Sequence, residues 1–406
     1  MKGHIKSRKS SFRPTKNRIS LLLSIYLMDL RARIEAVRRR MSADGLDLLI
    51  AASTGLHTLD RPDPVAYLTG YRSVGESIFL LHSSGDATLI VSPAADAERL
   101  TSRYNASTAL ATDDIVGTVE KILTGHPALT IGTVNLNSLP YRLAEQLLSL
   151  CAAAARPFDE ILYTIAGRKT NLEIERARTA AAIAEKGFAR LLQLARPGLR
   201  ECDLAVETNA FTKSLGAEDN FLMLNSLPHS HAVMPSSTRP IEPGDILLTE
   251  LSPNFDGQFS QICRTVSIGA PRRELQEKYD LVVRAMWAGI EAVRPGVPVS
   301  EVCRAIDRVL ESAGYAEYCR PPHMRRRGHG LGSGSVSPGD ISVDNHTILE
   351  ENMIFVVHPN QYIPQVGYLL CGEPVRVTAT GVEVLSSRTA ALGVVAAGHP
   401  GFVPCA

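Results

Sequence analysis

Two apolar runs near the middle of the chain predict a β-hairpin. Residues 246–248 are apolar, residues 253–257 read Pro-Asn-Phe-Asp-Gly, and residues 259–268 return to apolar and β-branched side chains. Proline, asparagine and an Asp-Gly pair are typical of turns, whereas β-branched residues favour strands. The pattern therefore predicts two antiparallel strands joined by a tight turn.

Polar side chains interrupt both predicted strands. Because side chains alternate between the faces of a strand, Glu250 shares the face of Leu248, and Gln261 shares the face of Cys263. Arg264 falls on the face opposite to Gln261, where we expect it to form a structural ion pair. A carboxylate and an amide among apolar residues are unfavourable without partners. We therefore expect later parts of the chain to supply partners for Glu250 and Gln261.

Elsewhere the chain alternates between helical and strand periodicities, with Pro-Gly or Gly signals at the boundaries. This alternation of helices and strands indicates a mixed α/β fold. The predicted elements are a helix from Asp29 that ends near Gly45, a strand over 46–51, a hairpin over 77–91, a helix over 172–194 capped by Asn171, and helices over 201–215, 274–293 and 299–313.

Length and composition indicate a soluble protein of two domains. The chain has 406 residues, of which 45% are hydrophobic and 21% are charged. Its formal net charge of +1 gives no indication of nucleic-acid or membrane binding. The seven cysteines are scattered, without a C-x-x-C motif, which argues against a disulfide framework or a structural zinc site and favours the reducing cytoplasm.

The two ends of the chain differ from the rest. Residues 1–27 are basic and Ser-rich and then apolar, and we expect them to lie outside the fold. They fit either a secretory signal or translation from a start upstream of Met28, and no small-residue cleavage site precedes Met28. Residues 391–406 are rich in Gly, Ala and Pro and predict a loose tail.

Three motifs together resemble the metallopeptidase family M24, which has the "pita-bread" fold and includes aminopeptidase P, prolidase, methionine aminopeptidase and the metal-free creatinase. The motifs are Gly244-Asp245 followed by Glu250, the run from Asp256-Gly257 to Arg264-Thr265, and Gly-His-Gly-Leu-Gly over 328–332. The resemblance implies a creatinase-like N-terminal α/β domain over 28–162, a pita-bread catalytic domain over 163–390, and a homodimer.

The resemblance also implies where metal ligands would fall. In the metal-dependent relatives, two Asp, one His and two Glu hold two divalent ions. The first Asp position falls on Glu250, the second on Gln261, and the His on His329. The first Glu position falls on His358, and the last falls on or beside Glu373, with the register open by one residue.

This set has too few carboxylates for two bridged ions. Glu250, His329, His358 and Glu373 are therefore candidate ligands of a single Zn, Fe or Mn ion. The alternative is metal-free chemistry, as in creatinase, in which imidazoles and carboxylates transfer protons directly.

Further candidate residues follow from the resemblance. The relatives carry a second active-site His after the G-H-G-x-G motif, but residues 333–338 contain none. Upstream, His231, with His229 as second choice, matches the position of the creatinase histidine, so the candidate catalytic residues are His231, His329 and Glu373.

Candidate substrate-binding residues are His229 and two arginines. Arg327 would act as an anion clamp beside His329, although the run 325–327 also fits a solvated turn. Arg72 would reach the site of a partner subunit.

The expected function is hydrolysis or lytic cleavage of a C–N bond in a small carboxylated, amidino or peptide-like substrate. A first alternative is a metal-dependent Xaa-Pro aminopeptidase or dipeptidase with an altered ligand set. A second is a catalytically silent homologue that binds a peptide or protein. The missing histidine and neutral Gln261 disfavour the first, and the intact G-H-G-L-G motif and the retained Glu373 disfavour the second.

Overall fold

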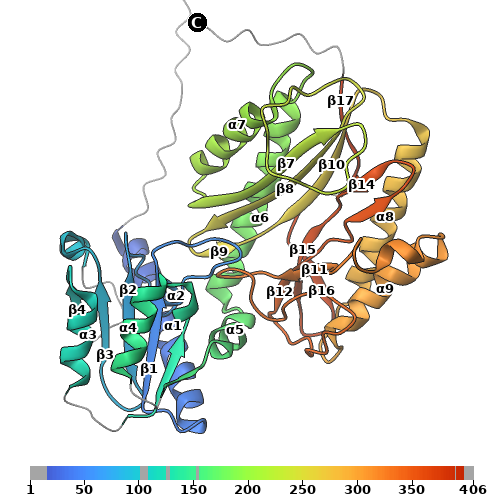
Figure 1. The fold of residues 1–406 in the computed structure, drawn as a ribbon. Coiled ribbons are helices and arrows are strands. Elements are labelled where there is room, and N and C mark those ends of the chain that lie inside the picture. Colours follow the sequence, from blue (N-terminus) through green and yellow to red (C-terminus); the bar gives the residue numbers. More distant parts are fainter. Residues whose placement is uncertain (1–15, 101–107, 125–128, 152–154, 389, 397–406) are drawn as a thin grey trace, which may run out of the picture.

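The computed structural model describes residues 16–100, 108–124, 129–151, 155–388 and 390–396. The chain forms two domains of mixed α and β structure, as the sequence predicts (Figure 1). Within the described residues, no helix has the length and apolar character needed to span a bilayer.

The N-terminal domain is a six-stranded sheet with helices on both faces (Figure 1). Successive residues of one central strand, Leu48 to Ser53, point to opposite faces of the sheet and so enter two different hydrophobic cores. Leu49 and Ala51 belong to the core on one face, and Leu48 and Ile50 belong to the core on the other. The strand order is β4-β3-β2-β1-β5-β6. The strands are β1 (Leu48–Ser53), β2 (Ser77–His82), β3 (Ala87–Val91), β4 (Thr108–Ala111), β5 (Ile131–Val134) and β6 (Ala155–Pro157), and the helices are α1 (Lys16–Ala43), α2 (Pro64–Thr69), α3 (Ile115–Leu123), α4 (Tyr141–Leu150) and α5 (Glu160–Gly167).

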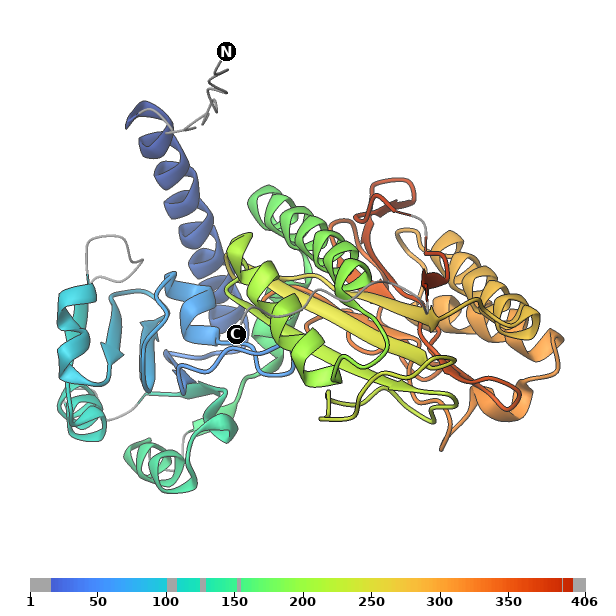
Figure 2. The same ribbon diagram turned by 90° about the horizontal axis from the view of Figure 1, so that it is seen from above.

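The first helix begins earlier than the sequence predicts. α1 starts at Lys16, so residues 16–27, expected to lie outside the fold, are continuous with the helix of the N-terminal domain. Its first turns extend beyond the sheet (Figure 2). Tyr26 contacts the fold, because its hydroxyl donates to the Gly70 carbonyl at 3.4 Å and its ring lies 5.1 Å from the Arg176 guanidinium. Residues 1–15 lie outside the described part.

The C-terminal domain contains three sheets. The largest has the order β17-β10-β8-β7, with β9 paired to β8, and α6 and α7 cover one of its faces (Figure 1). A second sheet has the order β11-β12-β15-β16, and β13 pairs with β14. The elements are α6 (Asn171–Leu194), α7 (Glu201–Ser214), β7 (Asp219–Leu227), β8 (Ile246–Phe255), β9 (Gln258–Phe259), β10 (Ile262–Ile268), α8 (Arg273–Glu291), α9 (Val299–Ser312), β11 (Gly328–Gly330), β12 (Ile354–Val357), β13 (Gln361–Ile363), β14 (Gly367–Leu369), β15 (Glu373–Val377), β16 (Val382–Val384) and β17 (Gly393–Val395).

Two local predictions need correction. The cap of α6 is Thr170 rather than Asn171: its hydroxyl accepts from the Glu173 amide, and the Glu173 carboxylate accepts from the Thr170 amide in return. The predicted tail begins inside the fold, because Gly393 to Val395 pair in parallel with Val266 to Ile268. Residues 397–406 lie outside the described part.

The central hairpin is confirmed, with a tighter turn than expected. β8 continues to Phe255, and the chain reverses at Asp256 and Gly257, whose φ angles are +46° and +83°. Glycine adopts such a positive φ without strain. The register places Glu250 opposite Cys263, which fixes the position of Glu250 relative to Gln261.

Candidate active site

Glu250 lies on β8 with two polar neighbours. Its carboxylate accepts a hydrogen bond from Asn360 Nδ2 at 3.0 Å, and Cys263 Sγ lies 3.8 Å from the same oxygen. Burial raises the pKa of Glu250, and these two donors only partly oppose the effect. Glu250 therefore retains a proton to a higher pH than an ordinary glutamate.

Two buried imidazoles lie on the second sheet. His329 is on β11 and His358 directly follows β12, its antiparallel partner; the ring centroids are 5.4 Å apart with an interplanar angle of 68°. His329 Nδ1 lies 3.0 Å from the Gly330 carbonyl, which can only accept. Nδ1 thus carries the proton of the neutral ring, and Nε2 keeps its lone pair.

Both imidazoles favour the neutral form. Burial lowers the pKa of His329 to about 4, and the positive charge of Arg326 acts in the same direction. Burial also lowers the pKa of His358 well below its ordinary value, with His329 adding to the effect. At neutral pH both rings are therefore available as bases and hydrogen-bonding groups.

Two buried polar atoms of this region lack a hydrogen-bond partner in the part of the chain that the structure describes. His358 Nδ1 and Gln261 Oε1 are inaccessible to solvent and make no hydrogen bond within the described residues. The Gln261 amide group is held only by Nε2, 3.6 Å from Cys263 Sγ. A buried polar atom without a partner is unfavourable by about 1–3 kcal/mol. Their position beside Glu250 and the imidazoles therefore suits a polar ligand.

Glu373 does not join this group, which corrects its prediction as a catalytic residue and metal ligand. It forms a buried ion pair with Arg264 at 2.7 Å and accepts a hydrogen bond from the Ser386 hydroxyl. Gly372 occupies the facing position instead, since a Cβ built there would lie 2.6 Å from the His358 Cβ. Adjacent residues of a strand face opposite sides, so the open register resolves to Gly372. The predicted structural ion pair of Arg264 is confirmed.

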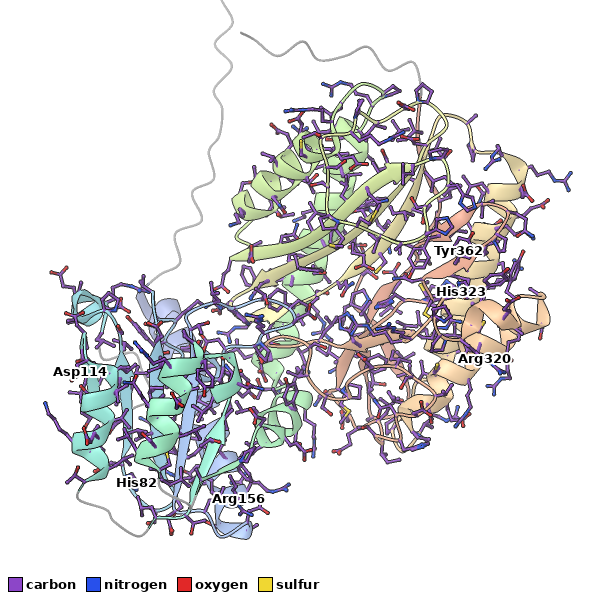
Figure 3. All side chains as sticks on the ribbon, viewed as in Figure 1. His82, Asp114, Arg156, Arg320, His323 and Tyr362 are labelled. Carbon is purple, nitrogen blue, oxygen red and sulfur yellow. The ribbon has the colours of Figure 1, made fainter. Side chains whose placement is uncertain are left out.

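His229 and His231 lie in a group of aromatic rings. The His231 ring stacks on Tyr362 with centroids 5.1 Å apart, and His323 stacks on Tyr362 at 5.9 Å. Figure 3 labels Tyr362 and His323 on the side of α9. Asn360, two residues before Tyr362, donates to Glu250 and so connects this group to the buried site.

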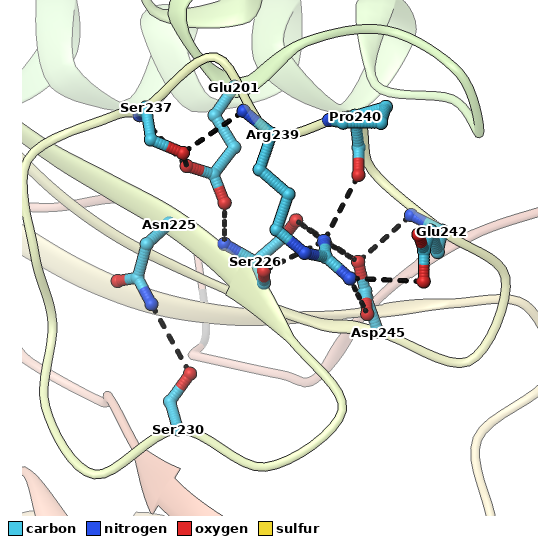
Figure 4. Close-up of polar contacts among 9 residues, drawn as sticks. All are labelled: Glu201, Asn225, Ser226, Ser230, Ser237, Arg239, Pro240, Glu242 and Asp245. Carbon is cyan, nitrogen blue, oxygen red and sulfur yellow. Dashed lines mark hydrogen bonds and ion pairs between the residues drawn. The ribbon is translucent and has the colours of Figure 1, made fainter.

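A polar network anchors the loop that carries His229 and His231 (Figure 4). Glu201 accepts from the backbone amides of Ser226 at 2.6 Å and Ser237 at 2.9 Å, and Arg239 pairs with Asp245. His229 Nε2 lies 3.0 Å from the Pro364 carbonyl. The loop is therefore held at both ends and in its middle.

The two predicted substrate arginines have other partners. Arg327 is 1% exposed; it pairs with Asp307 at 2.7 Å and donates to the Pro359 carbonyl, so it is a structural residue rather than an anion clamp. Arg72 contacts His57 Nδ1 at 2.7 Å and Glu218 at 3.2 Å, at the contact between the two domains of one chain. The expected role of Arg72 at the site of a partner subunit stays a prediction.

The residues present do not fit the metal centre that the resemblance implies. Glu373 is held by Arg264, Gly372 provides no ligand, and Gln261 is a neutral amide. Among the described residues, no group of three or more His, Cys, Asp and Glu side chains is arranged to hold a metal ion. We therefore assign no step of a reaction to a metal.

Sequence reasoning missed two residues of the site. Asn360 binds Glu250 and has a positive φ of +37°, for which its sequence signal is the short turn His-Pro-Asn after β12. Tyr362 organises the imidazole stack, but nothing in the local pattern distinguishes it from an ordinary strand residue.

Comparison with known proteins agrees with this architecture. The model of metallopeptidase family M24 matches residues 175–382, and that of the creatinase/prolidase N-terminal domain matches residues 33–165. An uncharacterised peptidase of Staphylococcus aureus (strain USA300) is 28% identical over 335 residues, which cover 80% of this chain and 92% of that protein.

Solved structures with the same fold include two enzymes named for prolyl substrates. The prolidase of Thermococcus sibiricus has a TM-score of 0.80 at 22% identity, covering 90% of this chain and 99% of that one. The Xaa-Pro dipeptidase of Bacillus anthracis has a TM-score of 0.77 at 22% identity, covering 90% of this chain and 100% of that one. With the family match spanning more than half of its residues, the chain belongs to metallopeptidase family M24.

Proposed function

We propose that this chain is a hydrolase that cleaves a C–N bond in a small peptide-like or carboxylated substrate without a metal centre. The proposal rests on one buried group of residues. His329 and His358 are neutral, and the pKa of Glu250 is raised. His358 Nδ1 and Gln261 Oε1 have no hydrogen-bond partner within the described residues. Strongly shifted titrating groups gathered at one place are typical of active sites. Family membership supports a hydrolase.

The residues of the site suggest a division of roles. His329 Nε2 accepts a proton from the attacking water, because Nδ1 is fixed as the donor to Gly330. In its protonated form, which burial favours, Glu250 gives its proton to the leaving nitrogen. Gln261 and His358 orient the substrate through their free atoms, and His231 binds the outer part of the substrate beside Tyr362.

The test is a substrate screen of the purified chain after exhaustive chelation and metal analysis. Xaa-Pro dipeptides, N-acyl amino acids and cyclic amidines cover the substrate classes. We expect turnover that survives chelation and falls at least 100-fold in His329→Gln and Glu250→Gln. Turnover that disappears on chelation and returns with one added metal would contradict the metal-free reaction and support the metal-dependent peptidase.

A silent binding protein is the second candidate, favoured by Gly372 and the Arg264–Glu373 pair, which leave Glu250 as the acidic group of the site. It predicts no turnover of any class by the folded protein, together with ligand binding that His329→Gln weakens. Any chelation-resistant turnover lost in that variant would exclude it.

The proposal also covers the cellular compartment and the oligomeric state of the protein. The six described cysteines are all unpaired, which supports a reducing compartment such as the cytoplasm. We propose a homodimer by resemblance to the family. Light scattering that gives the mass of a single chain would contradict the dimer.

A further inference from the structure

A cavity outside the candidate active site lies between α9 and the segment 319–327. Its volume is about 570 Å³, within the range of small-molecule sites. Figure 3 labels Arg320 at this place, beside the ribbon of α9. The cavity therefore has the size to enclose a small organic molecule.

The lining of the cavity is strongly basic. Six arginines and three acidic residues give it a formal net charge of +3, whereas the whole chain carries +1. The arginines are Arg304, Arg308, Arg320, Arg325, Arg326 and Arg327, and the acidic residues are Asp307, Glu311 and Asp344. Like charges gathered in a concave surface attract a ligand of opposite charge.

Half of these arginines have no ion-pair or hydrogen-bond partner for their side chains in the described part of the chain. Arg327 pairs with Asp307, Arg304 with Glu301 at 2.6 Å, and Arg326 with Asp340 at 3.0 Å. Arg308, Arg320 and Arg325 are exposed, and their side chains form no ion pair or hydrogen bond within the described residues. Their guanidinium donors are therefore free to bind an external anion.

The buried residues of the lining, here called the floor, differ in chemistry from its exposed arginines, here called the rim. Cys303, Cys319 and Met324 are buried and line its inner part, and burial raises the pKa of the Cys303 thiol to about 12, so that it stays neutral. Arg327 is fixed below the rim by Asp307 and the Pro359 carbonyl. An apolar floor under a rim of guanidinium groups suits a molecule with one apolar end and one multiply charged end.

We propose that this cavity binds an organic phosphate, with its phosphoryl groups against Arg308, Arg320 and Arg325 and its apolar part against the cysteine and methionine floor. Guanidinium groups match phosphoryl oxygens with paired hydrogen bonds, and three free arginines balance the charge of a diphosphate. Neither His329 nor His358 lines the cavity, and the proposal does not depend on the reaction assigned to them.

The test is titration calorimetry of the full chain with ADP, inorganic pyrophosphate, adenosine and citrate at constant ionic strength. We expect saturable binding of ADP, weaker binding of pyrophosphate, and none of adenosine. Arg320→Gln/Arg325→Gln should weaken ADP binding at least tenfold, because both side chains are exposed and unpaired. The matched control is Arg272→Gln/Arg294→Gln, which removes two exposed arginines outside the cavity lining.

Two further measurements test where ADP binds and whether the cavity prefers phosphoryl groups. Binding of ADP that persists in His329→Gln supports a site distinct from the candidate active site, whereas its loss there would overturn the assignment. Citrate that competes as well as pyrophosphate would overturn the preference for phosphoryl groups. No saturable binding of ADP, or equal weakening in the control, would overturn the proposal itself. If the double variant fails to fold, Arg308→Gln provides the same comparison.

Discussion

Gly372, directly before β15, stands where the backbone approaches two other segments. A Cβ at this position would lie 2.6 Å from the His358 Cβ and 3.1 Å from both Cβ and Sγ of Cys263. Its neighbour Glu373 faces Arg264 on the other side. At the scale of single residues, the absence of a side chain at 372 is therefore what allows His358 and Cys263 to pack together.

Replacement of Gly372 tests this packing. Gly372→Ala should lower the free energy of unfolding by about 1–3 kcal/mol, because His358 and Cys263 must move. Urea denaturation measures the change. Gly381→Ala is the control, since a Cβ at 381 meets no atom within 4 Å, and its effect should stay within about 0.5 kcal/mol. Equal effects of the two substitutions would contradict the close approach.

The low pKa of His329 predicts a pH dependence of stability. The folded state holds this ring neutral down to about pH 4, while the unfolded chain protonates it near its ordinary pKa of 6.5. Between these values the unfolded state binds more protons, so stability falls as the pH falls. The loss should be on the order of 2 kcal/mol between pH 7 and pH 4.5.

Denaturation at both pH values of the wild type and His329→Gln measures this term. The variant should lose less stability on acidification than the wild type does. Exposed His346 provides the comparison as His346→Gln. The same acid-induced loss in His329→Gln as in the wild type would contradict a neutral buried ring.

The sequence predicts the facing and the partners of some residues and not of others. Alternation along a strand placed Arg264 opposite Gln261, and the ion pair with Glu373 agrees. The same rule could not decide which of residues 372 and 373 faces the site. The strand there is short, and no residue of its sequence shows which face is turned inward. The partners of Arg327 could not be predicted either, since Asp307 and Pro359 come from segments that only the tertiary fold brings together.

At the scale of elements, the loop between β7 and β8 depends on one carboxylate. Glu201, at the start of α7, accepts hydrogen bonds from Ser226 N, Ser237 N and Ser237 Oγ. The loop between these two serines carries His229 and His231. Glu201 therefore positions residues that the proposed reaction uses without touching the buried imidazoles.

Loss of the Glu201 charge should loosen this loop. In Glu201→Gln one oxygen remains to accept, so we expect a destabilisation of about 1–3 kcal/mol and faster hydrogen exchange at the amides of Ser226 and Ser237. Glu207→Gln, an exposed position of the same helix, is the control. Unchanged exchange in Glu201→Gln would show that the loop is held by other contacts.

At the scale of the whole molecule, Glu173 connects the two domains. Besides its role in the cap of α6, its carboxylate lies 3.3 Å from Arg33 of α1 and accepts from Gln258 Nε2 at 3.2 Å. Both Arg33 and Glu173 are buried. Arg33 also pairs with Asp29, so removal of the Glu173 charge leaves this buried guanidinium with one of its two carboxylate partners.

Glu173→Gln should therefore destabilise the molecule by about 1–3 kcal/mol and weaken the contact between the domains. Urea unfolding gives the first quantity, and limited proteolysis at the domain junction gives the second. Glu175→Gln, two residues further along the same helix and 68% exposed, is the control. A variant as stable and protease-resistant as this control would contradict the role of Glu173.

The fold was more predictable than its boundaries. Amphipathic patterns gave the long helices, and two apolar runs with Asp-Gly gave the central hairpin, because these signals are local. The continuation of α1 back to Lys16 and the pairing of β17 with β10 depend on contacts with distant segments, such as Tyr26 with Gly70 and Gly393 with Val266. A basic or Gly-rich composition could not reveal those contacts.

The close approach of the backbone at Gly372 also limits which substitutions this chain can accept. A side chain at 372 meets the Cβ that every residue except glycine carries at 358, so these two backbone segments must move apart before a carboxylate can enter. A mutational path toward a five-ligand metal centre therefore needs substitutions that separate the segments, and not only new carboxylates at 358 and 372. Libraries confined to these two positions would miss such variants, whereas libraries that also vary the residues packed around Cys263 would sample them.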